Sequence, residues 1–526
     1  MAYSQAHLAM ATLALIPRLA SRAAANENKL LFGVAVIGAM LGVIANRRGI
    51  GISWDSTDYI SVGLSMSEGR GVLDVTGKPM VIRPPGLSLF VAAGDRLGVS
   101  PSLALVIVNA VSMAIVVWCT HRLLVRTAAR HVAVWIGVAL VAVSPSMLDI
   151  FSMAWSEPPF IALILVALLI ATREREWPWE FVLAATFTSM FFVRYTGPFY
   201  AAPIALVAAV VQVRKSGLLL AFLRVGTVLA VSLVAPWLWL MRNKELSGYL
   251  TGYRVAGGGT LLDPFKTFTA TVGSWLVGRA PLQGNGGIYL NWNDYSALMQ
   301  VGGVIIWLAV AAVIVAYFAR ASRHPREATI VLSACLWLVV FYGGFSAYRF
   351  VYDEMGPLDS RMMSGLYVPM VILLVVGIDR ITAQTSPVAL RIARVAATVA
   401  LVVVTWHSAT SVRDAVRYGD EGRHWGSLTH KLAPIHLFAR GLPDDAALFS
   451  NEPQSLFAGS YRWPIRNQYM TAEPALVPCG KRYFFWYNTT FLPDGKPVGG
   501  TVVFSDSTGE VIDLGTCDID IGRYWP

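Results

Sequence analysis

The stretch that decides the fold runs from Leu218 to Met241 and reads LLLAFLRVGTVLAVSLVAPWLWLM. Arg224, near its beginning, is the one charged residue within it. About 20 mainly apolar residues are enough for an α-helix to cross the hydrocarbon core of a bilayer. The stretch therefore predicts a transmembrane helix.

Further apolar runs of this kind precede and follow it. They are Leu30–Ala45, Ala104–Thr120, Val132–Val143, Pro158–Thr172, Trp179–Val193, Phe199–Val213, Val301–Phe318, Ile330–Phe345, Ser364–Ile378 and Val395–Trp406. The 526 residues are 55% hydrophobic and only 14% charged, and the mean hydropathy is +0.56. A soluble chain of this length needs more charge to cover its surface. The sequence thus predicts an α-helical polytopic membrane protein with about eleven transmembrane helices.

Basic residues outnumber acidic ones, and the formal net charge is +10. In a soluble protein this excess would suggest a nucleic-acid partner, but here it gathers in short loops on alternate sides of the predicted helices. This set comprises Arg122, Arg126, Arg130, Arg173, Arg175, Arg214, Lys215, Arg320, Arg323, Arg326, Arg380, Arg391 and Arg394 in the loops, together with Arg224 near the start of its span. Loops rich in arginine and lysine stay in the cytoplasm. We therefore expect a multi-pass protein of the inner or plasma membrane, with a cytoplasmic N-terminus and, after an odd number of spans, an extracytoplasmic C-terminus.

The composition changes after residue 410, where acidic residues and prolines become frequent. Tyr483–Tyr487 and Thr501–Phe504 are short runs of β-forming residues, and a turn-forming cluster follows the second. We therefore predict a transmembrane domain over residues 1–410 and a small soluble α/β domain over residues 411–526.

The four cysteines fall into two pairs. Cys119 and Cys335 lie in predicted spans, where a cysteine is usually a packing residue. Cys479 and Cys517 lie in the extracytoplasmic tail, where a disulfide can persist, although two free thiols are the alternative.

The long first loop, residues 47–100, has a mixed apolar and polar pattern that predicts two short helices in the membrane interface, over Tyr59–Glu68 and Pro84–Arg96. Asp55 and Asp58 open this loop. A carboxylate at the outer mouth of a membrane protein can accept the proton of a hydroxyl that attacks carbon. The alternative is structural, with Asp55 or Ser56 as the N-cap of the first short helix.

Glu157 is a further carboxylate beside a predicted span, and Ser156 precedes it while Pro158 follows. A serine, an acid and a proline in this order also describe the ordinary start of a helix. An ionisable group at the membrane boundary is nevertheless expensive, so Glu157 is a functional candidate as well.

Arg83, Arg194 and Arg361 lie in outer loops that otherwise avoid positive charge. The guanidinium fork suits phosphate, and the alternative for each arginine is a side chain that extends to lipid headgroups. The histidines near the start of the tail (His407, His424, His430 and His436) lack a metal-ligand spacing and are expected on the surface or in the core. No phosphate loop, dinucleotide-binding glycine motif or His-Glu-x-x-His motif is present in the sequence.

Several of these motifs follow one another in a familiar order. The first loop reads Asp55, Tyr59, Gly63, Gly69-Arg70-Gly71 and Arg83-Pro84-Pro85-Gly86, and Ser156-Glu157, Arg194-Tyr195-Thr196-Gly197 and Asp359-Ser360-Arg361 come later. This order resembles the membrane glycosyltransferases of the GT-C fold class, which use polyprenyl-phosphate sugars. Protein O-mannosyltransferases and the aminoarabinose transferases of lipid A belong to that class. The motifs cover residues 54–197 best, and the tail resembles no family.

The resemblance implies roles for the residues. Asp55 would be the general base, assisted by Asp58 or Glu157, in a single displacement that inverts the anomeric carbon. The substrate-binding residues would be Tyr59, Arg83, Arg194, Asp359 and Arg361. The partners would be a polyprenyl-phosphate sugar, a glycan, lipid or protein acceptor and the bilayer, without nucleic acid. No metal ligands are assigned, and a divalent cation is left open.

Two functions of other classes compete with this reading. A flippase or transporter of a lipid-linked sugar would use the same charges as a pathway, but transporters tend to hold charges near the membrane centre. The predicted spans are almost free of charge and the candidates lie at the outer rim. A non-catalytic scaffold of the cell envelope is the other alternative, against which the presence of Asp55 argues.

Overall fold

A computed structural model describes residues 26–253, 262–278, 295–319, 321–352, 359–383, 386–466, 480–488 and 499–516. Cys479 and Cys517, and with them the predicted disulfide, lie outside these residues. The chain forms two compact units. Unit 1 comprises Met1–Val43, Val108–Phe151 and Ser156–Ala415, and unit 2 comprises Ile44–Ile107, Ser152–Trp155 and Val416–Pro526.

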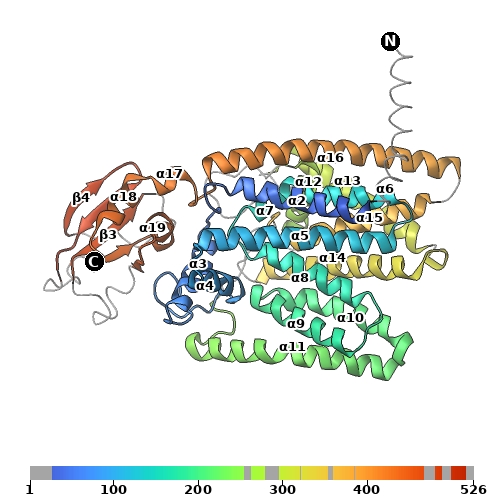
Figure 1. Cartoon of the computed structure of the whole chain (residues 1–526), viewed down its shortest axis with the longest axis horizontal. Helices are drawn as coiled ribbons and strands as arrows, with labels where there is room; N and C mark the ends of the chain where they lie inside the picture. The colour runs from blue at the N-terminus through green and yellow to red at the C-terminus, as the bar shows by residue number, and fades with distance from the viewer. Residues whose placement is uncertain are drawn as a thin grey trace, which may run out of the picture. The chain divides into compact units, whose positions relative to one another are not determined.

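Unit 1 is helical, and its long helices run side by side (Figure 1). It contains α6 (His131–Ala142), α7 (Pro145–Phe151), α8 (Glu157–Ala171), α9 (Trp177–Val193), α10 (Gly197–Ser216), α11 (Leu218–Ser247), α12 (Leu262–Val277), α13 (Ala297–Phe318), η2 (Ala321–Arg323), α14 (Arg326–Tyr352), η3 (Ser364–Leu366) and α15 (Tyr367–Thr382). Three more helices contribute residues to both units: α2 (Glu27–Ala45), α5 (Pro101–Thr127) and α16 (Pro387–Glu421).

Each of the eleven predicted apolar runs lies within helical structure, except that Val143 and Thr172 fall one residue beyond the ends of α6 and α8. Among the described residues, eight helices are long and apolar enough to cross a membrane, and nine if the bent pair α6 and α7 is one span. Helix α8 is apolar but shorter. The prediction of a multi-pass membrane protein is therefore confirmed, whereas the count of eleven spans stays a prediction.

Helices α12 and α13 of unit 1 pack closely because Gly273 of α12 lies against α13 and Gly303 of α13 lies against α12. A Cβ atom built on Gly273 would lie 1.7 Å from the Met299 carbonyl oxygen, and one on Gly303 would lie 1.8 Å from that of Thr269. Small residues allow this close approach in membrane bundles, where dispersion contacts between helices replace the hydrophobic effect.

Unit 2 contains α3 (Trp54–Ser67) and α4 (Gly86–Arg96), which pack against each other. These are the two short helices that the first loop predicts. Later in the chain come α17 (Leu428–Lys431), α18 (Pro434–Gly441), β1 (Ala447–Ser450), α19 (Pro453–Ser460), β2 (Ile465–Arg466), β3 (Arg482–Tyr487), β4 (Thr501–Ser505) and β5 (Gly509–Asp513). Figure 1 shows these strands and helices as a small α/β fold.

The five strands of unit 2 form one mixed sheet in the order β2-β1-β3-β5-β4. Strand β1 is parallel to β2 and β3, whereas β5 is antiparallel to β3 and β4. Successive residues of β3 bury on opposite faces, with Tyr483 and Phe485 in one apolar cluster and Phe484 in another. The small α/β domain in the tail is therefore confirmed.

The predicted boundary between residues 410 and 411 falls within α16, and the compact units group the first loop with the tail. The division into a 1–410 domain and a 411–526 domain stays a prediction. Cys119 and Cys335 are buried free cysteines, as expected of packing residues.

Candidate functional site

The first group of predicted site residues lies in unit 2, on α3 and the segment before α4. Arg83 Nε donates to Asp58 Oδ2 at 2.7 Å, and Arg83 Nη2 lies 2.5 Å from Asp55 Oδ1. The Arg83 guanidinium carbon lies 5.9 Å from the centre of the Tyr59 ring, which is buried. We call Asp55, Asp58 and Arg83 the loop cluster; in it two carboxylates share one guanidinium.

The spacing of the two aspartates explains why one arginine reaches both. Asp55 and Asp58 are three residues apart on α3, which places them on the same face of the helix. Burial raises the pKa of Asp58 to about 6, although the Arg83 guanidinium opposes this shift. Asp58 is therefore a carboxylate that titrates near neutral pH.

The structural alternative, with Asp55 or Ser56 as the N-cap of the first short helix, is wrong. Helix α3 begins at Trp54 with Ser53 as its N-cap, and the Ser53 backbone N–H donates to Ser56 Oγ at 3.0 Å. Asp55 is thus already inside the first turn of α3, and its carboxylate pairs with Arg83.

The second group lies in unit 1, where Glu157 Oε1 is 2.5 Å from Arg194 Nη1 and accepts a bond from Arg361 Nε at 2.7 Å. Arg194 also donates to Ser156 Oγ at 3.0 Å. We call Glu157, Arg194 and Arg361 the bundle cluster; it pairs one carboxylate with two guanidiniums. Glu157 is buried within the first turn of α8, so its charge also faces the positive end of the helix dipole.

Asp359 belongs to the surroundings of the bundle cluster. Its Oδ1 accepts the Met362 backbone N–H at 2.9 Å, which shapes the turn that carries Arg361. Burial raises the pKa of Asp359 to about 6, and the charges of Arg361 and Glu157 act on it in opposite directions. This carboxyl group is therefore another that titrates close to neutral pH.

The histidines of the tail behave as expected of structural residues. His436 is fully buried, donates or accepts through Nε2 at 2.8 Å from the Tyr487 hydroxyl, and approaches the His430 carbonyl with Nδ1 at 2.7 Å. Over the described part of the chain, no group of three or more histidine, cysteine, aspartate or glutamate side chains is arranged to hold a metal ion.

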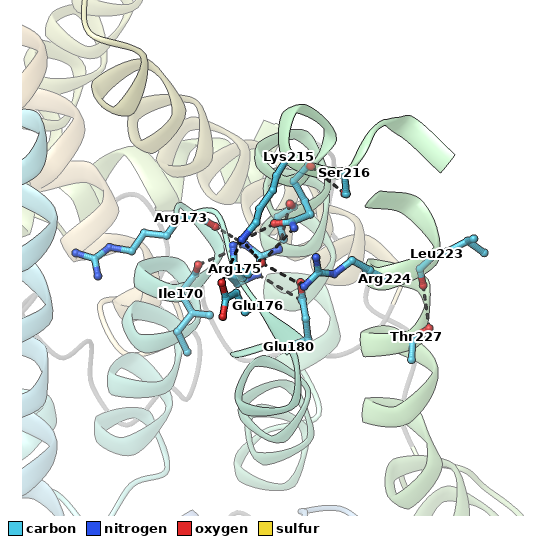
Figure 2. A network of polar contacts seen from close by, with 12 residues as sticks. Ile170, Arg173, Arg175, Glu176, Glu180, Lys215, Ser216, Leu223, Arg224 and Thr227 are labelled. Atoms are coloured by element: carbon cyan, nitrogen blue, oxygen red, sulfur yellow. Dashed lines mark hydrogen bonds and ion pairs between the residues drawn. The ribbon is translucent and has the colours of Figure 1, made fainter. Parts of the chain in front are cut away.

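A third charged arrangement escaped the sequence reasoning. At the turn between α8 and α9, Arg175 Nε donates to Glu180 Oε2 at 3.4 Å, and Arg224 Nη2 lies 3.3 Å from Glu180 Oε1 (Figure 2). We call Arg175, Glu180 and Arg224 the turn network. Helices α8 and α9 pack together across this turn, so it lies at the opposite end of α8 from Glu157.

Arg175 caps the C-terminal end of α8. Its guanidinium donates to the carbonyl oxygens of Ile170, Ala171 and Arg173 at 3.4, 2.9 and 3.0 Å, and to that of Ala208 on α10 at 3.2 Å. These bonds use the carbonyls that a helix end leaves unpaired. The signal in the sequence was an acid, Glu180, inside a predicted span with arginines in the flanking loops.

Comparison by sequence is negative, because no protein-family model and no curated protein matches the chain. Comparison by structure is positive. The chain is similar to ArnT from Cupriavidus metallidurans in the apo state, with a TM-score of 0.62 and 13% identity over 96% of this chain and 100% of ArnT. It has the GT-C fold.

Two more structures share that fold. ArnT from Cupriavidus metallidurans bound to undecaprenyl phosphate matches with a TM-score of 0.60 and 13% identity, over 93% of this chain and 98% of ArnT. The arabinofuranosyltransferase AftD from Mycobacteria matches with a TM-score of 0.51 and 13% identity, over 94% of this chain and 40% of AftD. At 13% identity, these similarities show the fold of the chain alone.

Proposed function

We propose that the protein is a glycosyltransferase that moves a sugar from a polyprenyl-phosphate donor to an acceptor hydroxyl at the outer face of the membrane. The observation that carries the proposal is the pair of charged clusters on a GT-C fold. The loop cluster has an excess of carboxylate, and the bundle cluster pairs a single glutamate with two arginines. The first suits proton abstraction and the second suits a phosphate.

The proposed reaction is one displacement. The Asp55 carboxylate takes the proton of the acceptor hydroxyl while that oxygen forms a bond to the anomeric carbon. The bond from the anomeric carbon to the donor phosphate oxygen breaks with inversion, and the polyprenyl phosphate leaves with one more negative charge. Arg83 and Asp58 hold Asp55 in place through the shared guanidinium.

Stabilising the leaving group falls to the arginines of the bundle cluster. Fixed positive charge lowers the barrier most where negative charge develops, which here is the departing phosphate. Arg194 and Arg361 supply two guanidinium forks, and Glu157 orients both. Tyr59 and Arg83 are the further substrate-binding residues of the proposal, and Asp359 shapes the turn that carries Arg361.

An apolar cavity of unit 1 suits the isoprenoid chain of the donor. It has a volume of about 290 Å³ and lies among α6, α12, α13, α15 and α16. Its wall includes Tyr367, which follows Arg361 by six residues on the same segment. ArnT, with the same fold, binds undecaprenyl phosphate. A lipid whose phosphate meets Arg361 can therefore place its chain in apolar surroundings.

The orientation follows from the charges. We propose that the turn network and the basic loops near it face the cytoplasm, as the positive-inside rule requires. The opposite ends of the helices, including the start of α8 with Glu157, then face outward. In this orientation the N-terminus is cytoplasmic, the tail is extracytoplasmic, and the protein belongs to the inner or plasma membrane.

The test is transfer of label from a panel of polyprenyl-phosphate sugars into envelope fractions by membranes that contain the full-length protein. We expect Asp55→Asn to lower transfer by about 10²–10⁴-fold, the usual range for a positioned general base, without loss of folded protein. Matched activity in Asp55→Asn would remove Asp55 from the mechanism. Absence of transfer by the folded wild type from every donor would favour a lipid-linked-sugar flippase or an envelope scaffold.

A further inference from the structure

Three segments far apart in the sequence meet just before α3 in unit 2. The Gly51 N–H donates to the Ser152 carbonyl at 3.0 Å, and the Ala154 N–H donates to the Gly51 carbonyl at 2.8 Å. On the other side, the Trp425 N–H donates to the Ile52 carbonyl at 3.0 Å. Residues 51–52 thus make two isolated parallel β-bridges, Gly51 with Met153 on one side and Ile52 with His424 on the other. We call these three paired segments the small sheet.

The small sheet leaves no room for adjustment. A Cβ atom on Gly51 would lie 2.3 Å from Met153 Sδ and 2.9 Å from Arg423 Cβ, and one on Gly426 would lie 2.4 Å from the Ile50 carbonyl oxygen. His424 has a left-handed backbone, with φ of 48°. Such a conformation persists only where the surrounding structure over-determines it. The tail segment is therefore held in one position against residues 51–52.

Side chains extend this contact into the first turn of α3. The Trp54 and Trp425 rings lie 6.3 Å apart, and Trp155 Nε1 donates to Oγ of Ser53, the N-cap residue, at 2.7 Å. Arg423 Nη1 donates to Ser152 Oγ at 2.7 Å and so joins the two outer segments. Farther along, α19 of the tail packs against α3. The residues on either side of the α3 N-terminus are therefore fixed by the tail.

We propose that the tail segment Arg423–Trp425 positions Asp55, with Trp425 as its main positioning residue. The proposal rests on the proposed function, in which Asp55 is the general base. Asp55 follows Ile52 by three residues, and Trp54 between them packs on Trp425. A displacement of about 1 Å in a catalytic group can cost roughly 10²-fold in rate, so a loose first turn would be expensive.

This assigns the C-terminal part of the chain a role in catalysis that does not require it to touch substrate. In this proposal the tail acts through the backbone that carries the base, and helix α19 of the tail also packs on α3. Residues 152–154 lie on the same small sheet, three residues before Glu157 in the chain. Asp55 and Glu157 therefore each come three residues after a segment of the small sheet in the sequence.

The test compares full-length Trp425→Ala and Trp425→Phe with Trp486→Ala, a matched loss of a half-buried tryptophan from the sheet of the same unit. The first measurement is amide hydrogen exchange over residues 54–59, which needs no activity. We expect faster exchange in Trp425→Ala and wild-type exchange in Trp486→Ala. Equal exchange in Trp425→Ala and wild type, or equal acceleration by both alanine variants, would overturn the proposal.

The second measurement is the steady-state rate with the donor that the wild type uses. Trp425→Ala should lower kcat by about 10–100-fold while the donor KM changes little, because misplacement of the base affects the displacement itself. Trp425→Phe should recover most of kcat, because it restores an aromatic ring. Faster exchange with unchanged kcat would overturn the positioning of Asp55. A wild type without transfer would instead contradict the proposed function, while faster exchange would still support the contact between tail and helix.

Discussion

The two ends of α8 carry the same charged groups in different surroundings. Glu157 at its start pairs with two arginines, and Glu180, across the turn from its end, does the same. The arginine side chains of the bundle cluster are 13% and 21% exposed, whereas those of the turn network are 2% and 8% exposed. The bundle cluster and the turn network thus contain the same residue types, but solvent reaches the arginines of the bundle cluster more easily.

Hydrogen bonding explains the difference. The Arg175 side chain donates hydrogen bonds to four backbone carbonyls and to Glu180 (Figure 2). The backbone carbonyl of Arg175 accepts hydrogen bonds from Gln212, Lys215 and Arg224. The turn network therefore ties α8 to α9, α10 and α11. Arg194 and Arg361 are partly exposed at the other end, and in the proposed function this exposure lets the donor phosphate reach them. We therefore propose a structural role for the turn network and a phosphate-binding role for the bundle cluster, although both contain one glutamate and two arginines.

The largest effect is expected from Arg175→Met. This change leaves Glu180 buried with one arginine and removes the donors from the end of α8. Breaking a buried ion pair by removing one partner costs about 3–5 kcal/mol. We expect a large drop in thermal stability in detergent and in folded yield, with normal transfer per folded molecule.

The control for that variant is Lys215→Gln at the same turn. The Lys215 side chain is 39% exposed, pairs with the exposed Glu176 and donates a long bond of 3.4 Å to the Arg175 carbonyl. Its loss should therefore cost only about 0–1 kcal/mol. Equal destabilisation by the two variants would show that the turn network is no lock.

A smaller but more specific effect is expected from Arg361→Gln. If the bundle cluster stabilises the departing phosphate, loss of one charged donor should lower kcat by about 10²–10³-fold. Thermal stability should change much less than in Arg175→Met, because Arg361 is more exposed and Glu157 keeps Arg194. Arg361→Lys should retain part of the rate. If Arg361→Gln unfolds as readily as Arg175→Met, the bundle cluster has the same structural role as the turn network, and the proposed difference between the two ends of α8 is wrong.

The smallest effect concerns pH. The pKa of Asp359 is raised to about 6 by burial, so this group gains a proton as the pH falls through 6. The neutral acid no longer offsets the charge of Arg361, and a phosphodiester donor keeps its single negative charge in this range. The donor KM should therefore fall by a few-fold from pH 7 to pH 5, on the scale of a partly screened charge pair. Asp359→Asn should show the low KM at both pH values, and an unchanged pH dependence in that variant would exclude Asp359 as its origin.

Much of the site was predictable because charge is costly at a membrane boundary. Asp55, Asp58, Glu157 and the outer arginines stand out against long apolar runs, and the structure gathers them into two clusters. Their pairing was not predictable. That Arg83 serves both aspartates depends on the approach of α4 to α3, and that Ser53 caps α3 depends on where the small sheet ends.

The turn network was missed for a related reason. In the sequence, Arg175 is one of many basic loop residues, and only the fold shows that its side chain turns inward to the end of α8. The pairing of the tail segment Arg423–Trp425 with residues 51–52 was equally unpredictable, because a backbone pairing of three residues has almost no effect on composition.

By itself, the sequence determined that this is a multi-pass helical membrane protein with a small α/β tail. The bilayer accepts only long apolar segments whose backbone groups bond within the helix, and that requirement is written into local composition. Only the tertiary structure decided which charged residues pair and that the turn network is more deeply buried than the bundle cluster. It also decided that Trp425 of the tail contacts Trp54 in the first turn of α3. Those outcomes depend on contacts between different elements, from Asp55 and Arg83 within the first loop to Trp54 and Trp425 at distant places in the chain. In such contacts burial and geometry, not local preference, set the energy of each interaction.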